Sequence, residues 1–256
     1  MHLVIAFNPL DQFEIRSIIE LSISVFNNLH LSLTNIGLYL IISLILNFMF
    51  ALLSENNEKL LMNKWSLNQE SIVITVKNLV VNQISGTSGQ IYFPFIYTLF
   101  MFILINNLIG MVPYNFATTS HFALTFSLSF TIVIGATLLG FQKHGLKFFS
   151  LFVPAGCPLG LLPLLVLIEF ISYLSRCVSL GLRLGANVMS GHMLLNILSG
   201  FIYKIMASGI IYFIIGLIPL AFVIALCGLE LAIAFIQAYV FVILTSSYIK
   251  DGLYLH

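Results

Sequence analysis

Long apolar stretches alternate with short polar ones along this chain of 256 residues. An α-helix needs about 20 mainly apolar residues to cross the hydrocarbon core of a bilayer. Stretches of that length or longer recur five times, and polar residues or glycine and proline close each of them. The pattern predicts membrane-crossing helices over residues 31–53, 91–112, 122–141, 160–204 and 205–249. The expected fold class is an all-α polytopic membrane protein, a single membrane domain over residues 1–256.

Residues 65–84 form a stretch of a different kind, because charged and amide side chains are interspersed among the apolar ones. Glu70 and Lys77 make the stretch too polar to cross a bilayer, and Trp65 at its start is typical of an interfacial anchor. We therefore expect one amphipathic helix that lies on the membrane surface.

The last two apolar stretches are unusually long. Each has about 45 residues and would extend about 67 Å as a single helix, roughly twice the thickness of the hydrocarbon core. Either each stretch is broken, or two long, tilted helices pack as an antiparallel hairpin that turns near Gly209. A steep tilt is hard to explain in lipid alone, whereas a curved protein partner would explain it.

Composition agrees with a membrane location. Hydrophobic residues make up 60% of the chain and charged residues only 7%, and the formal net charge of +1 gives no reason to expect a nucleic-acid partner. The N-terminal segment is mostly acidic, while lysines follow the first and third spans, so the positive-inside rule places the N-terminus outside and the C-terminus inside. Three cysteines in apolar surroundings, Cys157, Cys177 and Cys227, are expected to be buried free thiols.

Charged side chains inside the last two spans are few, and such groups are costly in a bilayer and usually functional. Glu169, Arg176 and Arg183 follow one another at intervals of seven residues, which places them on one helical face that Asn187 extends. Three pairs fall at similar depths when the hairpin is aligned about its turn: Glu169 with Asp251, Arg183 with Gln237, and His192 with Glu230. Carboxylates and imidazole titrate near usable pH, so this layout is typical of a proton path.

Simpler interpretations remain open for two of these groups. Glu169 and Arg176 could form a structural ion pair, and His192 could tie two helices together by a hydrogen bond. Arg183 is different, because nothing acidic in the chain is expected at its depth. We expect its counter-charge to come from another protein. Small residues would let that protein approach closely: Gly181, Gly185, Ala186, Ser190 and Gly191.

The segment from Leu180 to His192, LGLRLGANVMSGH, resembles the signature of subunit a of the rotary ATP synthase, the stator of its membrane sector. Further segments resemble the mitochondrially encoded, fungal-type subunit: PLDQFEI from Pro9, NLIGMVPY from Asn107, KHG from Lys143, LFVPAG from Leu151 and YIKDGLYLH from Tyr248. The resemblance covers nearly the whole chain. Residues 1–8 would then be a short leader that the family sometimes removes.

The resemblance implies a role for each polar residue near mid-span. Arg183 matches the essential arginine that faces the carboxylate of the rotating c-ring, and Asn187 and Gln237 match its polar neighbours. The c-ring, the peripheral stalk, other membrane-sector subunits and the lipid bilayer are the implied partners. Two long tilted helices beside a ring are also what the family's fold implies.

The remaining polar residues match two offset half-channels. His192 and Glu230 match the half-channel open to the intermembrane space, and in some relatives this pair holds a metal ion. Glu169 and Asp251 match the half-channel open to the matrix. The implied location is the mitochondrial inner membrane, with the N-terminus in the intermembrane space and the C-terminus in the matrix.

Other function classes fit the sequence less well. A transporter or channel that works alone is the alternative, but the chain has no inverted repeat of interrupted helices. A haem-bearing redox subunit is weaker still, because only His121 and His192 lie near spans. No nucleotide-binding glycine-rich loop is present, so we expect no cofactor and expect ATP to be made elsewhere in the complex.

Overall fold

A computed structural model describes residues 10–22, 30–55, 63–84, 88–112, 115–153 and 160–254 of the chain. Its short elements are η1 (Asp11–Phe13), β1 (Ser17–Ser22), β2 (His30–Thr34), η2 (Thr118–Ser120) and η3 (Gly145–Phe152). Its long helices are α1 (Asn35–Ser54), α2 (Lys64–Gln83), α3 (Ser88–Gly110), α4 (Phe122–His144), α5 (Leu162–Met206) and α6 (Ile210–Leu253). The leader expected over residues 1–8, and Cys157, lie outside the described residues.

The all-α polytopic fold class is confirmed. Within the described part of the chain, five helices are long and apolar enough to cross a membrane, namely α1, α3, α4, α5 and α6. The helix α2 is the sixth, and it coincides with the stretch expected to lie at the surface. Its residues Val76, Leu79 and Val80 are buried while Trp65 is exposed, as an amphipathic helix requires.

The first span begins later than its apolar pattern indicates. The expected start was residue 31, but residues 30–34 form β2, which pairs with β1 in an antiparallel hairpin, Ser22 opposite His30. Residues 30–34 alternate between polar and apolar side chains, the period of a strand, and Thr34 then precedes α1 in an extended conformation. A two-stranded hairpin therefore precedes the first crossing helix.

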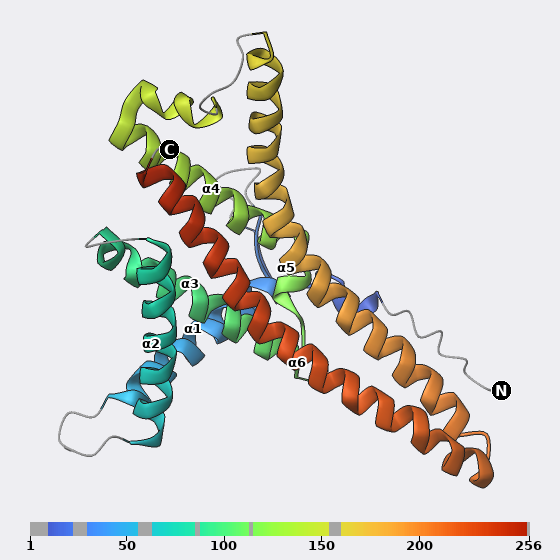
Figure 1. Ribbon diagram of the computed structural model, residues 1–256. Coiled ribbons are helices and arrows are strands. Elements are labelled where there is room, and N and C mark those ends of the chain that lie inside the picture. Colours follow the sequence, from blue (N-terminus) through green and yellow to red (C-terminus); the bar gives the residue numbers. More distant parts are fainter. Residues whose placement is uncertain are drawn as a thin grey trace.

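The two C-terminal helices are continuous and form the expected antiparallel hairpin. Figure 1 shows α5 and α6 side by side toward their shared turn, whereas the beginning of α5 projects away from the other helices. Gly209 at the turn has a φ of 155°, a conformation that side-chain-bearing residues rarely adopt. Of the two alternatives for these stretches, long unbroken helices are the one the structure has.

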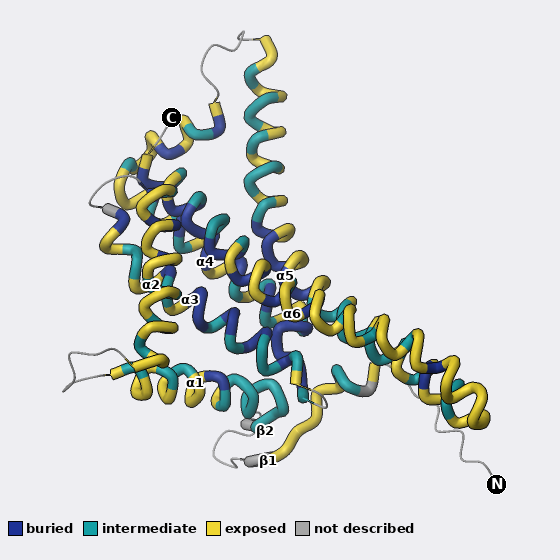
Figure 2. Tube along the Cα trace, turned by 60° about the horizontal axis from the view of Figure 1, so that its bottom comes forward, coloured by how far each residue is buried: buried dark blue, intermediate teal, exposed yellow. Residues whose placement is uncertain are grey.

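The interior is formed by α3, α4 and the adjoining faces of α2, α5 and α6. Buried residues lie mainly on α3, α4 and the C-terminal half of α6, while α1 and the turn end of the hairpin are mostly intermediate or exposed (Figure 2). Ile103 on α3, Leu184 on α5 and Val242 on α6 are completely inaccessible. The extensive apolar exposure elsewhere is what lipid or partner subunits would cover.

The glycines of α5 serve a purpose other than the expected one. A Cβ atom on Gly181 would lie 2.9 Å from Phe126, and one on Gly185 would lie 3.0 Å from Phe122. Both glycines therefore let α4 approach within the chain, not a second protein. Ala186 and Ser190 do lie on an exposed face of α5.

The expectation that all cysteines are buried is wrong for one of them. Cys177 is buried, and the Ser129 hydroxyl donates a hydrogen bond to its backbone carbonyl. Cys227 is exposed on α6. An apolar sequence around a cysteine in a membrane helix does not distinguish the protein interior from a face that lipid or a partner covers.

Candidate functional site

The polar level furthest from the turn of the hairpin, here called the inner level, is a cluster of three charges rather than a pair. Arg176 lies 3.6 Å from Glu169 on its own helix and 3.6 Å from Asp251 near the end of α6. The expected pairing of Glu169 with Asp251 is therefore made through the guanidinium between them. About a third of each of these side chains is exposed.

One level further along, α5 and α6 are joined by a pair of amides. The Asn187 side-chain nitrogen donates a hydrogen bond of 3.1 Å to the Gln237 side-chain oxygen. Gln237 is buried, whereas Asn187 is exposed on α5. The sequence had aligned Gln237 with Arg183, and the observed hydrogen-bond partner of Gln237 is Asn187, four residues further along α5.

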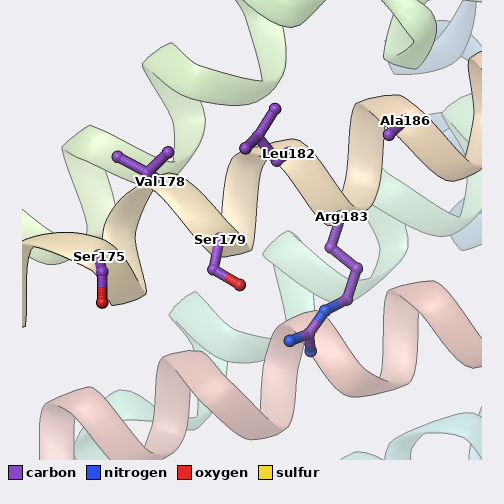
Figure 3. Close-up of a pocket in the computed structure, with 6 residues that line it drawn as sticks. All are labelled: Ser175, Val178, Ser179, Leu182, Arg183 and Ala186. Carbon is purple, nitrogen blue, oxygen red and sulfur yellow. The ribbon is translucent and has the colours of Figure 1, made fainter. Parts of the chain in front are cut away.

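Arg183 stands apart from these contacts. In the described part of the chain, Arg16 and Arg176 form ion pairs with carboxylates, and Arg183 does not. Arg183 is exposed and lines a groove of about 580 Å³ on α5. Figure 3 shows its guanidinium extending beyond the other lining residues, which are Ser175, Val178, Ser179, Leu182 and Ala186. A side chain that keeps its positive charge therefore lines an open groove, part of whose lining consists of small side chains.

The polar level nearest the turn of the hairpin, here called the outer level, is buried between the helices. His192 Nδ1 on α5 lies 3.7 Å from Glu230 Oε1 on α6, too far for a hydrogen bond, and both Glu230 oxygens are buried without a hydrogen-bond partner among the described residues. The two side chains line a cavity of about 10 Å³, close to the smallest volume that accommodates a water molecule. A cavity lined by imidazole and carboxylate suits water-assisted proton transfer.

Comparison with known proteins gives these residues a context. The family model described as ATP synthase A chain matches residues 36–250. The chain belongs to the ATP synthase A chain family. It is similar to the ATP synthase subunit a of Penicillium chrysogenum, with 69% identity over 100% of this chain and 99% of the relative. It is also similar to the subunits a of Emericella nidulans, 71% identical over 97% of each chain, and of Saccharomyces cerevisiae, 49% identical over 97% and 96%.

A metal at the outer level would find few ligands in this family member. His192 and Glu230 supply two donors, and within the described residues no three His, Cys, Asp or Glu side chains gather at one place. Zinc sites built from protein usually take three or four protein ligands. The pair could therefore hold a divalent cation only together with water molecules.

Two members of the site have contacts that the sequence did not predict. The ion pair of Arg176 with Glu169 was one of the open alternatives and is present in the structure, but the second contact of Arg176, with Asp251, depends on how α6 ends beside α5. Asn107 on α3 donates a hydrogen bond of 3.3 Å to the Ala234 carbonyl on α6 and lines the cavity of Glu230. Asn107 and its neighbour Asn106 interrupt a run of apolar residues in α3, and this was the signal that could have identified it.

A further histidine, His121, lies immediately before α4. The His121 ring stacks on Phe116 with 4.9 Å between centroids, and burial lowers the pKa of its imidazole. Burial therefore disfavours the charged form of this imidazole.

Proposed function

We propose that this chain carries protons to and from a rotating ring of membrane helices through two separate half-paths, with Arg183 between them. The observation that carries the proposal is an exposed Arg183 that has no ion pair among the described residues and has a polar site on either side of it along the hairpin. The outer site holds His192 and Glu230, and the inner one holds Glu169, Arg176 and Asp251. Proton translocation in the membrane sector is also the role that membership of the family supports.

The groove beside Arg183 is better suited to a partner protein than to a small ligand. Besides Arg183 it is lined by the small side chains of Ser175, Ser179 and Ala186 and by Val178 and Leu182. A guanidinium keeps its proton and is costly in hydrocarbon, so it needs an anion at its own depth. A carboxylate on a neighbouring helix, carried past this face by a ring, would supply that anion once in each passage.

The proton route follows from these charges. A proton enters by His192 and Glu230 and neutralises a ring carboxylate, which can then face lipid at little cost. After nearly a full turn the carboxylic acid reaches the inner cluster and releases its proton there. Arg183 favours the ionised carboxylate between the two paths and repels any proton that would cross directly. Asn187 and Gln237, hydrogen-bonded beside it, hold the two helices at this level.

The proposal includes an orientation. The lysines that follow the first and third spans mark the inner side, so the N-terminus lies in the intermembrane space and the C-terminus in the matrix. The membrane is the mitochondrial inner membrane, as the fungal relatives suggest. The chain would assemble there with the c-ring, the peripheral stalk and other membrane-sector subunits, and have its apolar helices covered by lipid.

Replacing Arg183 tests the proposal. Arg183→Ala should abolish proton-driven ATP synthesis in the assembled enzyme while ATP hydrolysis by the detached catalytic head survives. Arg183→Lys should also fail largely, because a compact ammonium can lose its proton when desolvated. Arg16→Ala is the matched control, since Arg16 is exposed and its ion pair within the described residues is with Glu14, two residues away. Normal coupled synthesis with Arg183→Ala would overturn the proposal.

A further inference from the structure

The last residues of α4 lie against the last residues of α6, although about a hundred residues separate them along the chain. Figure 1 shows the end of α6 beside α4. His144 Nε2 lies 3.0 Å from the backbone carbonyl oxygen of Leu253. The Lys143 ammonium lies 5.1 Å from the centre of the Tyr254 ring. Two successive residues of α4 therefore contact two successive residues at the end of α6.

The hydrogen bond of His144 satisfies a carbonyl group that α6 itself cannot. Leu253 is the last residue of α6, and the last carbonyl groups of a helix have no partner within it. Leu253 is buried, and a buried carbonyl without a partner is costly. Because a carbonyl oxygen can only accept, Nε2 carries the proton and donates it to the bond. His144 thus caps α6 from a neighbouring helix.

The backbones of α4 and α6 also meet next to this hydrogen bond. A Cβ atom on Gly252 would lie 2.8 Å from the Ala136 carbonyl oxygen and 3.6 Å from the Gly140 nitrogen. A side chain at position 252 therefore has no room unless the helices part. The close contact and the cap together fix how the end of α6 is rotated against α4.

This rotation decides where Asp251 points. At about 100° per residue, Asp251 lies about 200° around the helix from the buried Ile249 and Leu253. Its carboxylate is therefore directed away from the buried side of α6. There Asp251 Oδ2 lies 3.6 Å from the Arg176 guanidinium on α5. This contact is the one that joins α6 to the inner cluster.

We propose that His144 is a positioning residue of the inner site: by holding the end of α6 on α4, it keeps Asp251 opposite Arg176. The proposal rests on the function proposed above only in taking Glu169, Arg176 and Asp251 as the inner site. In this role the imidazole of His144 donates one hydrogen bond and transfers no proton.

Replacements of His144 that differ in reach test this role in the assembled enzyme. His144→Ala should slow proton-driven ATP synthesis at least about threefold at equal amounts of enzyme, because it removes the hydrogen bond to α6. His144→Gln should restore most of the rate, because its amide nitrogen can reach the position of Nε2. His144→Asn is the matched control, since its amide is one methylene group too short. A normal rate with His144→Ala, or equal rates for the Gln and Asn variants, would overturn the proposal.

A thiol at the end of α6 reports the position of this helix independently of activity. In a parent without native cysteines, Leu253→Cys keeps the backbone carbonyl and should react slowly with a polar thiol reagent, because position 253 is buried. His144→Ala should speed that reaction at least about tenfold, and His144→Gln should not. Ile132→Cys on α4, 6% exposed against 5% for Leu253, is the control and should not respond. An unchanged rate at position 253, or an equal increase at position 132, would also overturn the proposal.

Failure of the proposed function gives a different result. Asp251→Asn removes the carboxylate itself and should slow synthesis whatever residue stands at position 144. If Asp251→Asn slows synthesis and His144→Ala does not, the inner site stands and His144 does not position it. If Asp251→Asn synthesises ATP at the normal rate, the inner half-path is wrong and the positioning role of His144 fails with it.

Discussion

Arg176 and Arg183 carry the same charge on the same helix, yet their surroundings differ completely. Arg176 lies between Glu169 and Asp251, whereas Arg183 lies exposed beside a groove with no carboxylate near it in the described chain. The charge of Arg176 is neutralised within the chain, whereas the charge of Arg183 is available to a partner. This difference in counter-charge is the reason to assign the central role to Arg183 and a local role to Arg176.

The outer pair leads to a prediction about metal inhibition. Zinc added from the intermembrane side should slow proton-driven ATP synthesis, because imidazole and carboxylate donors face one cavity. His192→Ala should raise the zinc concentration needed for half-inhibition by about tenfold, since it removes one of the two protein donors. The measurement is the synthesis rate against zinc concentration in the assembled enzyme.

His144→Ala is the control for that experiment. His144 lies on the far side of the molecule, where its Nε2 contacts the Leu253 carbonyl at 3.0 Å, so its loss should leave zinc sensitivity unchanged. A fully assembled His192→Ala enzyme with the sensitivity of the unmodified chain would defeat the metal-binding idea. His192 would then serve only to join α5 and α6.

The residue pairs show what sequence spacing can and cannot give. His192 and Glu230 meet as the hairpin alignment predicted, because both lie in the half of the hairpin nearest its turn. Further from the turn the helices diverge, so Asp251 reaches Arg176 and not Glu169 directly. Small offsets accumulate along a long hairpin, and the sequence alone contains no measure of them.

At the scale of the elements, the packing of α5 on α6 depends on one glycine. A Cβ atom on Gly191 would lie 2.6 Å from Glu230 Oε1 and 2.9 Å from its Cδ. Glu230 therefore occupies the space that a side chain at position 191 would take. The close approach of the two helices and the placement of the carboxylate both depend on the absence of a side chain at position 191.

Gly191→Ala should consequently impair the enzyme more than an ordinary glycine replacement does. The methyl group must displace the Glu230 carboxylate or part the helices, so proton-driven synthesis should fall several-fold at equal amounts of assembled enzyme. Gly200→Ala, on the same helix with nothing within 4 Å, should leave synthesis unchanged or stabilise α5 by about 0.5–1 kcal/mol. If both variants synthesise ATP equally fast, Gly191 is not what positions Glu230.

The sequence predicted which helices form more readily than it predicted which elements contact one another. Five apolar spans and one amphipathic helix follow from hydropathy, because the bilayer imposes both length and composition. The β1–β2 hairpin and the contacts of Gly181 and Gly185 with α4 did not follow. Both depend on which neighbour a segment meets, and in a membrane lipid and protein neighbours favour the same apolar residues.

At the scale of the whole molecule, the proposed function makes the chain only half of a proton path. Among the described residues, the buried side chains of Phe241, Val242 and Leu184 lie in the interior between the two polar sites and are apolar. The chain reconstituted alone in vesicles should therefore conduct no protons, whereas the membrane sector with its ring should. A proton flux through the chain alone, driven by a pH gradient, would favour the alternative of an autonomous channel or transporter.

The central claim is that the inner and outer sites open to opposite sides of the membrane. Two cysteine variants in a parent without native cysteines test it most directly: Ser172→Cys, between Glu169 and Arg176 on α5, and Val188→Cys, in the outer cavity. With a membrane-impermeant thiol reagent, Val188→Cys should react from the intermembrane side and Ser172→Cys from the matrix side. Reaction of both from one and the same side would contradict the two-path account.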